Sequence, residues 1–357
     1  MHVVGARPNF MKIAPLMREM AKQPKVFKQV LVHTGQHYDP MMSQIFFDDL
    51  GLPRPDINLE VGSGTHAWQT AHIMLRFETV VQEYLPDWVV VPGDVNSTLA
   101  CALVCSKLGI KVAHIESGLR SFDRTMPEEI NRVLTDQIAD LLFTTSPDAN
   151  ENLLREGIDP EKIFFVGNIM IDTLVTLLPL ANKRWSEIKS LWALNDFMLV
   201  TLHRPSNVDN LTNLQEIMET LKKLSKTIKI IFPLHPRTAK LIEQHALYEK
   251  IHNFLLTNPL GYIDFLALES HARLVLTDSG GVQEETTFLG VPCLTIRPNT
   301  ERPITISHGT NRLVENKKEK ILLAVYQALN NLTNAKKIPE LWDGRTAKRI
   351  VDVFLNL

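Results

Sequence analysis

The feature that most constrains the fold is a regular alternation of short β-branched runs with longer amphipathic segments along almost the whole chain. Short β-branched runs indicate strands, and apolar residues at a spacing of three to four indicate helices, such as 12–21 and 97–107. We expect strands at 3–4, 30–33, 88–91, 112–115, 142–144, 164–166, 197–201, 228–232, 274–277 and 293–296. This alternation is typical of parallel strands joined by crossover helices and predicts an α/β fold.

The chain is long enough for two such domains, with 357 residues of which 45% are apolar. The turn-like pair Gly167-Asn168 is followed by helix-like sequence without a strand until Phe197. We therefore expect an N-terminal Rossmann-like domain at 1–168 and a second Rossmann-like domain at 169–345.

Charge and cysteine content narrow the range of partners. The formal net charge is −2, so no overall basic field favours nucleic acid or an anionic membrane. Neither a signal peptide nor a stretch of membrane-spanning length is expected, which points to a cytoplasmic protein. Cys101, Cys105 and Cys293 form no CxxC pair, so we expect buried thiols and no metal site.

Polar motifs follow many of the predicted strands. Parallel sheets place ligand sites at the carboxyl ends of their strands, so these motifs are where a site is expected. They read GARPNFMK, TGQHYD, PGDVNST, ESGLRSFDRTMPEEINR, LHRPSN, PLHPRT and DSGGVQEE.

The motif DSGGVQEE combines a strand end with two glycines that open a helix. Backbone N–H groups near Ser279, Gly280 and Gly281 could bind a diphosphate, although an ordinary capped turn has the same sequence. Cationic groups also follow strands in both halves, namely Arg7, Lys12, His203, Arg204, His235, Arg237 and Arg302. Neither GxGxxG nor a Walker sequence is present, so a nucleotide-sugar site between the domains is favoured over a dinucleotide or P-loop site.

Three carboxylates occur in the same strand-end positions. Asp94 and Glu116 each follow a continuous apolar strand and are expected to act in proton transfer. Glu128 follows Pro127, so it is either a third such group or only a first-turn residue favoured by the helix dipole. A closed cleft that excludes water would make these groups more effective bases.

Taken together and in this order, the motifs GARPNFMK, PGDVNST, AHIESGLRS, MPEEINR, TLHRPSN, TDSGGVQEE and TERP resemble the non-hydrolysing UDP-N-acetylglucosamine 2-epimerases across nearly the entire chain. The resemblance implies a glycosyltransferase-B-like architecture with a central cleft, a homodimer, and a last helix at 346–357 that packs back on the first domain. It also implies interconversion of UDP-N-acetylglucosamine and UDP-N-acetylmannosamine through a 2-acetamidoglucal, without NAD, metal or another cofactor.

Residue roles follow from the same resemblance. Asp94, Glu116 and Glu128 would move protons, while Arg7, His203, Arg302 and the turn at 279–281 would hold the diphosphate. Lys12, Arg132 and His235 would join the cleft, Glu285 would bind the ribose hydroxyls, and Phe265 would line the uracil pocket.

The sequence departs from the family pattern in one region. Members activated by a second substrate molecule have a loop resembling QHR and a downstream arginine, whereas this chain has Gln36-His37-Tyr38 and His72. This difference argues against activation by substrate.

Several related functions remain open from the sequence. They are a hydrolysing 2-epimerase that releases N-acetylmannosamine, an epimerase for a UDP-diacetamido uronic acid, a glycosyltransferase of the same fold, and a non-catalytic nucleotide-sugar sensor. A sensor would need the cationic groups but not three strand-end carboxylates.

Overall fold

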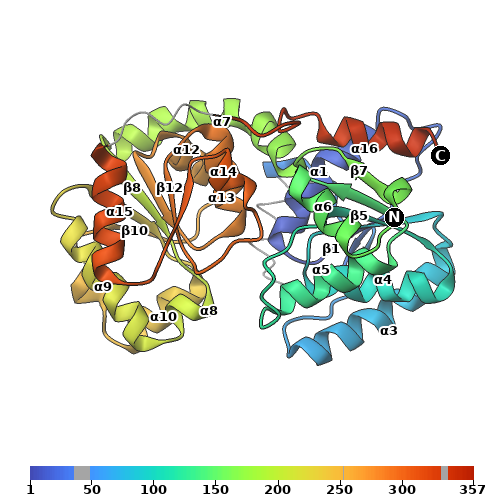
Figure 1. The fold of residues 1–357 in the computed structure, drawn as a ribbon, viewed down its shortest axis with the longest axis horizontal. Coiled ribbons are helices and arrows are strands. Elements are labelled where there is room, and N and C mark those ends of the chain that lie inside the picture. The colour runs from blue at the N-terminus through green and yellow to red at the C-terminus, as the bar shows by residue number, and fades with distance from the viewer. Residues whose placement is uncertain (36–48, 252, 331–336) are drawn as a thin grey trace. The chain divides into compact units, whose positions relative to one another are not determined.

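The computed structural model describes residues 1–35, 49–251, 253–330 and 337–357, apart from the side chain of Arg7. Two compact units divide the chain: Met1–Thr176 together with Glu340–Leu357, and Leu177–Pro339 (Figure 1). The division falls inside a long helix, α7 (Ile169–Leu191), which begins at the first residue of the second domain expected from the sequence.

The first unit is built on a seven-stranded parallel sheet in the order β3-β2-β1-β4-β5-β6-β7. Its strands are β1 (His2–Val4), β2 (Leu31–His33), β3 (Ile57–Asn58), β4 (Trp88–Pro92), β5 (Lys111–Ser117), β6 (Leu141–Thr144) and β7 (Ile163–Phe165). Its helices are α1 (Arg7–Met20), α3 (His66–Tyr84), α4 (Asn96–Leu108), α5 (Pro127–Ile138), α6 (Pro147–Arg155), the short η1 (Pro160–Lys162), the start of α7, and α16 (Thr346–Leu355).

The second unit repeats this plan with a six-stranded parallel sheet in the order β10-β9-β8-β11-β12-β13. Its strands are β8 (Phe197–Thr201), β9 (Lys229–Pro233), β10 (Leu255–Thr257), β11 (Leu274–Thr277), β12 (Cys293–Ile296) and β13 (Asn311–Val314). Its helices are α8 (Pro205–Val208), α9 (Leu211–Leu224), α10 (Pro236–Gln244), α11 (Tyr248–Ile251), α12 (Tyr262–His271), α13 (Gly280–Leu289), α14 (Ile304–Ser307) and α15 (Lys318–Asn330). The expected α/β fold with two parallel-sheet domains is confirmed.

Within the described part of the chain, three strands were not expected from the sequence, and all three are edge strands. β3 and β10 each form the first edge of a sheet and β13 forms the last edge of the second. The residues of β10 are only half-buried, and those of β3 are half-buried or exposed, so neither strand needs the apolar run that marks a central strand. Helix α1 also begins five residues before the expected start at Lys12, because Pro8 fits the first turn of a helix.

The C-terminal segment of the chain is part of the first unit. Trp342 is fully buried, and its indole nitrogen donates to the carbonyl oxygen of Thr145 at 2.9 Å. Asp172 of α7 accepts hydrogen bonds from the backbone N–H groups of Thr346 and Ala347 at 3.1 and 2.7 Å, which satisfies the free N–H groups at the start of α16. Helix α16 packs against α1, as Figure 1 shows in red and blue.

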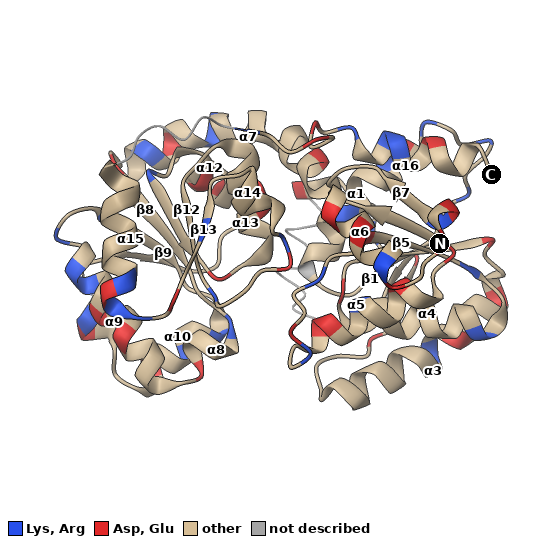
Figure 2. Ribbon diagram, viewed as in Figure 1, with Lys and Arg blue, Asp and Glu red and all other residues tan. Residues whose placement is uncertain are grey.

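The three cysteines are free and buried within the sheets and helices, as expected for packing thiols. Burial raises the pKa of both the Cys105 and the Cys293 thiols to about 12. No helix within the described ranges combines the length and the apolar character that a membrane span requires. Figure 2 shows charges of both signs interspersed on both units.

Candidate active site

In each sheet the order in which successive strands are added reverses once. The reversal falls between β1 and β4 in the first sheet and between β8 and β11 in the second. In doubly wound sheets this topological switch point is where ligands bind, because the connections on its two sides diverge and leave the strand ends open. The residues predicted to form the site fall into two groups, one beside each switch point.

In the first unit, Lys12 and Glu116 form a buried ion pair between Nζ and Oε2. Lys12 comes from the second turn of α1, after β1, and Glu116 comes from the end of β5. Glu116 has a positive φ of 70°, and the register between β5 and β6 shifts at this residue. A non-glycine residue in this conformation is strained, and such strain is found where a side chain must be aimed at a particular point.

Asp94, which follows β4, is held by Arg132 of α5 through Nη2 and Oδ2 at 2.5 Å. Arg132 also pairs with Glu129 at 2.8 Å, and Asn131 donates to the backbone oxygen of Asp94 at 2.9 Å. Glu128 lies in the first turn of the same helix and is half-buried. Helix α5 therefore carries one of the three predicted carboxylates, Glu128, and holds a second, Asp94, through Arg132.

Gly93 connects these two pairs. Its φ of +68° is one that L side chains rarely adopt, and a Cβ at this position would lie 2.9 Å from Nζ of Lys12. Lys12 thus packs directly against the backbone that precedes Asp94, so the four residues Lys12, Asp94, Glu116 and Arg132 form one group.

In the second unit, Asp278 at the end of β11 organises the loop that follows β8. Its carboxylate accepts from the backbone N–H groups of His203 and Arg204 at 3.0 and 2.9 Å, and from Nδ2 of Asn207 at 3.1 Å. It also lies 2.9 Å from Nδ1 of His203. Burial alone would raise the pKa of Asp278, but the hydrogen bonds and charge from His203 and its neighbours outweigh it and lower this pKa.

His203 and His235 lie together, with ring centroids 5.4 Å apart. His235 caps α10, because its Nδ1 accepts from the backbone N–H of Arg237 at 3.2 Å. The structure therefore brings both predicted histidines into one group beside β8. Arg237 pairs instead with Asp209, which is not a predicted site residue.

Ser279, Gly280 and Gly281 form the start of α13, as the sequence predicted. The guanidinium of Arg302 lies against Gly280, since a Cβ there would be 2.6 Å from its Nη1. Arg302 also pairs with Glu284 at 2.9 Å and with Glu301, and Glu301 pairs in turn with Arg297 at 2.7 Å. The helix start is thus lined by an arginine whose position is fixed by buried carboxylates.

Glu285 lies in the second turn of α13 and is buried. Tyr262 of α12 donates to its Oε1 at 2.7 Å, and Phe265 is half-buried one turn along α12. Burial and the neighbouring Glu285 raise the pKa of Glu269, also on α12, well above its usual range. Both effects favour the neutral form of Glu269 beside Glu285.

Two predictions fall partly outside the described residues. Arg7 is the first residue of α1, but its side chain is outside the described part of the chain, as is the Gln36-His37-Tyr38 loop. His72 is described: its ring stacks on Trp68 with centroids 4.2 Å apart, and its Nδ1 lies 2.8 Å from the backbone oxygen of Trp68.

Sequence reasoning missed four residues that shape these groups: Asp278, Glu129, Tyr262 and His114. Glu129 accepts from the N–H and hydroxyl of Ser121 and from the N–H of Phe122, and so ties the loop before α5 to Arg132. Asp278 and Glu129 stand beside predicted residues in the motifs DSGG and PEEINR, and this adjacency is a signal that could have identified them.

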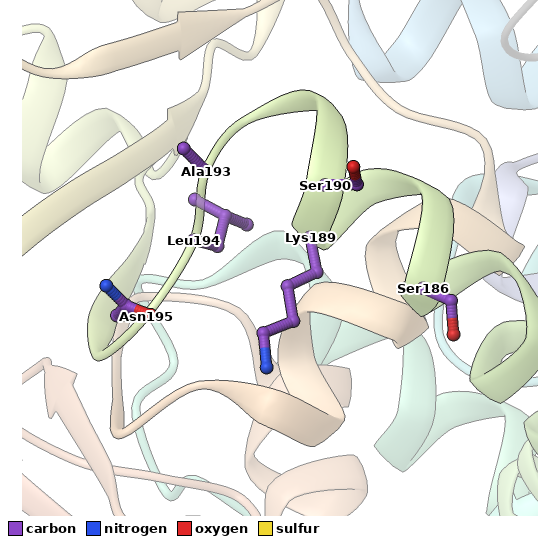
Figure 3. Close-up of a pocket in the computed structure, with 6 residues that line it drawn as sticks. All are labelled: Ser186, Lys189, Ser190, Ala193, Leu194 and Asn195. Atoms are coloured by element: carbon purple, nitrogen blue, oxygen red, sulfur yellow. The ribbon is translucent and has the colours of Figure 1, made fainter.

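A shallow depression of about 390 Å³ lies elsewhere in the second unit (Figure 3). It is formed by the end of α7 and the following loop, and is lined by Ser186, Lys189, Ser190, Ala193, Leu194 and Asn195. No predicted site residue lines it, so it is separate from the two groups.

The fold and the two groups define a class: an α/β protein with two Rossmann-type sheets, each with charged side chains at its switch point. A family model described as UDP-N-acetylglucosamine 2-epimerase matches residues 18–355. A UDP-N-acetylglucosamine 2-epimerase of Methanocaldococcus jannaschii is 45% identical over 360 residues, covering 99% of this chain and 97% of the relative. The chain belongs to the UDP-N-acetylglucosamine 2-epimerase family, and the resemblance found in the sequence is confirmed.

Two further comparisons bear on the substrate. A crystal structure of the Methanocaldococcus jannaschii UDP-GlcNAc 2-epimerase in complex with UDP-GlcNAc and UDP matches with a TM-score of 0.93 and 44% identity, covering 100% of this chain and 99% of that one. A UDP-2,3-diacetamido-2,3-dideoxy-D-glucuronate 2-epimerase of Pseudomonas aeruginosa is 42% identical over 315 residues, covering 87% of each chain.

Proposed function

We propose that this protein interconverts UDP-N-acetylglucosamine and UDP-N-acetylmannosamine by eliminating UDP and adding it back, with the proton on carbon two returned to the other face of the sugar. The observation that carries the proposal is the presence of two charged groups at the switch points, in a chain that matches epimerases of this name along nearly its full length. One group is suited to bind an anion and the other to move a proton.

The leaving group is the main chemical difficulty. The hydrogen on carbon two is not acidified by a neighbouring carbonyl, so it leaves readily only as the bond from carbon one to the UDP oxygen breaks. The start of α13, with Ser279, Gly280 and Gly281, and the guanidinium of Arg302 support binding of the diphosphate charge that develops. We propose that Arg7, His203 and His235 contribute to the same task.

His203 is suited to more than charge stabilisation. With its Nδ1–H donated to ionised Asp278, Nε2 of the neutral ring is the acceptor, and a proton there makes the ring a cation oriented by Asp278. We propose that this ring hydrogen-bonds the departing phosphate oxygen.

The carboxylates of the first unit carry the proton steps in this proposal. A carboxylate removes the proton from carbon two, the C–H electron pair becomes the C1=C2 bond of a 2-acetamidoglucal, and the C1–O pair leaves with UDP. Re-addition reverses these changes with a proton delivered to the opposite face. Asp94, Glu116 and Glu128 are the candidates, and the ion pairs with Arg132 and Lys12 support a fixed position for the first two.

The remaining roles concern the nucleoside. We propose that Glu285 accepts hydrogen bonds from the ribose hydroxyls, because Tyr262 fixes the position of its carboxylate through Oε1. Phe265, half-buried on the neighbouring helix, is proposed to contact the uracil ring. No metal or other cofactor is required by these steps.

Incubation with UDP-N-acetylglucosamine in deuterated water, followed by NMR of the sugar, tests the reaction. We expect deuterium at carbon two in both UDP-sugars. Release of free N-acetylmannosamine would identify a hydrolase, and absence of exchange until an acceptor is added would identify a glycosyltransferase.

A second candidate substrate is a UDP-diacetamido uronic acid, because the Pseudomonas aeruginosa relative with that name is 42% identical. This substrate carries a carboxylate at carbon six and an acetamido group at carbon three. Comparison of kcat/KM for the two UDP-sugars decides between them, and we expect UDP-N-acetylglucosamine to be preferred.

We further propose that the protein is a cytoplasmic homodimer without activation by its substrate. Free, buried cysteines agree with a reducing compartment. Light scattering during size-exclusion chromatography tests the dimer. A hyperbolic rate curve without a lag, starting from UDP-N-acetylmannosamine alone, tests the absence of activation.

A further inference from the structure

His114 lies in β5 with its ring fully buried, and both ring nitrogens face oxygen atoms. Nδ1 lies 2.6 Å from Oδ1 of Asp136 on α5, and Nε2 lies 2.7 Å from the backbone oxygen of Gly93 at the end of β4. A backbone carbonyl can only accept a hydrogen bond, and so can an ionised carboxylate. Both nitrogens must then donate, which requires the imidazolium form of the ring.

The surroundings of His114 agree with a charged ring. Asp136 is also 2.7 Å from Nη1 of Arg120, and Arg120 forms two hydrogen bonds with Glu156 at 2.8 and 2.6 Å. Burial would raise the pKa of Asp136, but the charges and hydrogen bonds of His114 and Arg120 lower it, so this carboxylate is ionised. The cluster holds the buried Asp136, the half-buried Glu156 and one arginine besides the ring, so a charged ring balances it and a neutral ring would leave one net negative charge.

The oxygen that His114 binds belongs to the peptide that leads into Asp94. Gly93 has a φ of +68°, a conformation that glycine adopts readily. Side-chain hydrogen bonds orient the peptide groups on its two sides. Asn9 and Thr98 donate to the preceding carbonyl, that of Pro92, at 3.0 and 2.8 Å, and His114 donates to that of Gly93. Lys12 packs on Gly93 and pairs with Glu116. The Gly93–Asp94 peptide therefore supports both ion pairs of the group, Lys12–Glu116 and Arg132–Asp94.

We propose that His114 is a positioning residue in the imidazolium form, which holds the Gly93–Asp94 peptide. It thereby fixes Asp94 for proton transfer, together with Lys12, which pairs with Glu116. This inference rests on the proposed function for its catalytic part. His114 does not touch the substrate in this proposal and does not exchange a proton with it.

The charge of the ring is tested without substrate. In long-range ¹H–¹⁵N NMR of the wild-type protein at neutral pH, we expect both nitrogens of His114 to carry hydrogen, with the signals assigned by their loss in His114→Gln. His2 is an internal control, because burial lowers its pKa to about 3 and its Nε2 has one partner, Gln29, at 3.0 Å. A wild-type His114 with a single N–H would overturn the inference.

The positioning role is tested by kinetics of His114→Gln, which removes the charge and one donor. We expect kcat to fall by about 10²-fold, because small displacements of catalytic groups have effects of this size. The KM for the UDP-sugar and the Kd for UDP, measured by calorimetry, should stay near the wild-type values, because the proposed diphosphate-binding residues other than Arg7 lie in the other unit. His2→Gln, at another buried histidine of the same sheet, should retain the wild-type kcat.

Other outcomes separate the possible failures. An unchanged kcat in His114→Gln, or a loss of UDP affinity equal to the loss of kcat, would overturn the positioning role. If the wild-type protein exchanges no deuterium at carbon two, the proposed function fails instead, and the NMR measurement still decides the charge of His114.

Discussion

Nδ1 of His203 lies 2.9 Å from Oδ1 of Asp278, so the ring at the end of β8 is oriented by a buried carboxylate at the end of the neighbouring strand β11. Such a carboxylate fixes one tautomer of the histidine and stabilises its protonated form. The same carboxylate accepts two backbone N–H groups of the β8 loop, so the loop and the ring are fixed together.

We therefore predict that Asp278→Asn lowers kcat by about 10²- to 10⁴-fold, since an amide can leave the ring in the wrong tautomer. Steady-state kinetics with UDP-N-acetylglucosamine measures this effect. The control is Asp264→Asn, which removes the exposed pair with Arg184 in the same unit and should leave kcat unchanged. Wild-type kcat in Asp278→Asn would contradict a role for the pair in turnover.

Lys12→Met should destabilise the protein by about 3 to 5 kcal/mol, because it removes the buried cation that pairs with the Glu116 carboxylate. The double variant Lys12→Met/Glu116→Gln should recover most of this loss, although it stays inactive. Urea unfolding followed by circular dichroism measures both. The exposed pair Lys22–Glu19 is the control, and Lys22→Met there should change the free energy of unfolding by less than about 1 kcal/mol.

Gly93→Ala should lower both stability and kcat. The φ of +68° costs an alanine about 1 to 2 kcal/mol, and its methyl group would also displace Lys12. Gly109 is a matched control with a φ of +69° and open space around it. Gly109→Ala should show a similar strain in unfolding experiments while kcat stays at the wild-type value; equal kcat in both variants would argue against the contact with Lys12.

The free energy of unfolding should decrease as the pH falls, in part because of His2. Burial, and to a lesser extent the nearby N-terminal charge, lowers the pKa of His2 in the folded protein from 6.5 to about 3. Between these two pH values the unfolded chain binds one more proton than the folded chain, so a fall in pH favours the unfolded state. The slope from this residue is at most about 1.4 kcal/mol per pH unit. Urea unfolding at several pH values should give a shallower decline for His2→Gln between pH 6 and 4, and identical slopes would refute the assignment.

Central strands and strand-end motifs could be predicted from the sequence, because buried parallel strands are continuous apolar runs and polar residues end them sharply. The edge strands β3, β10 and β13 could not, since a half-exposed strand has no such run. The early start of α1 at Arg7 was missed for a similar reason: its first turn is polar and contains proline.

The sequence by itself determined the class of fold, the family, and which residues stand at the ends of strands, because these properties depend on local pattern and on motif order. Only the tertiary structure decided the pairings: Lys12 with Glu116, Asp94 with Arg132, His203 with Asp278, and His114 with both Asp136 and Gly93. Partners in these contacts are between 21 and 104 positions apart, by subtraction of their residue numbers. Strand order brings them together, and no local pattern encodes which distant charge will neutralise a buried one.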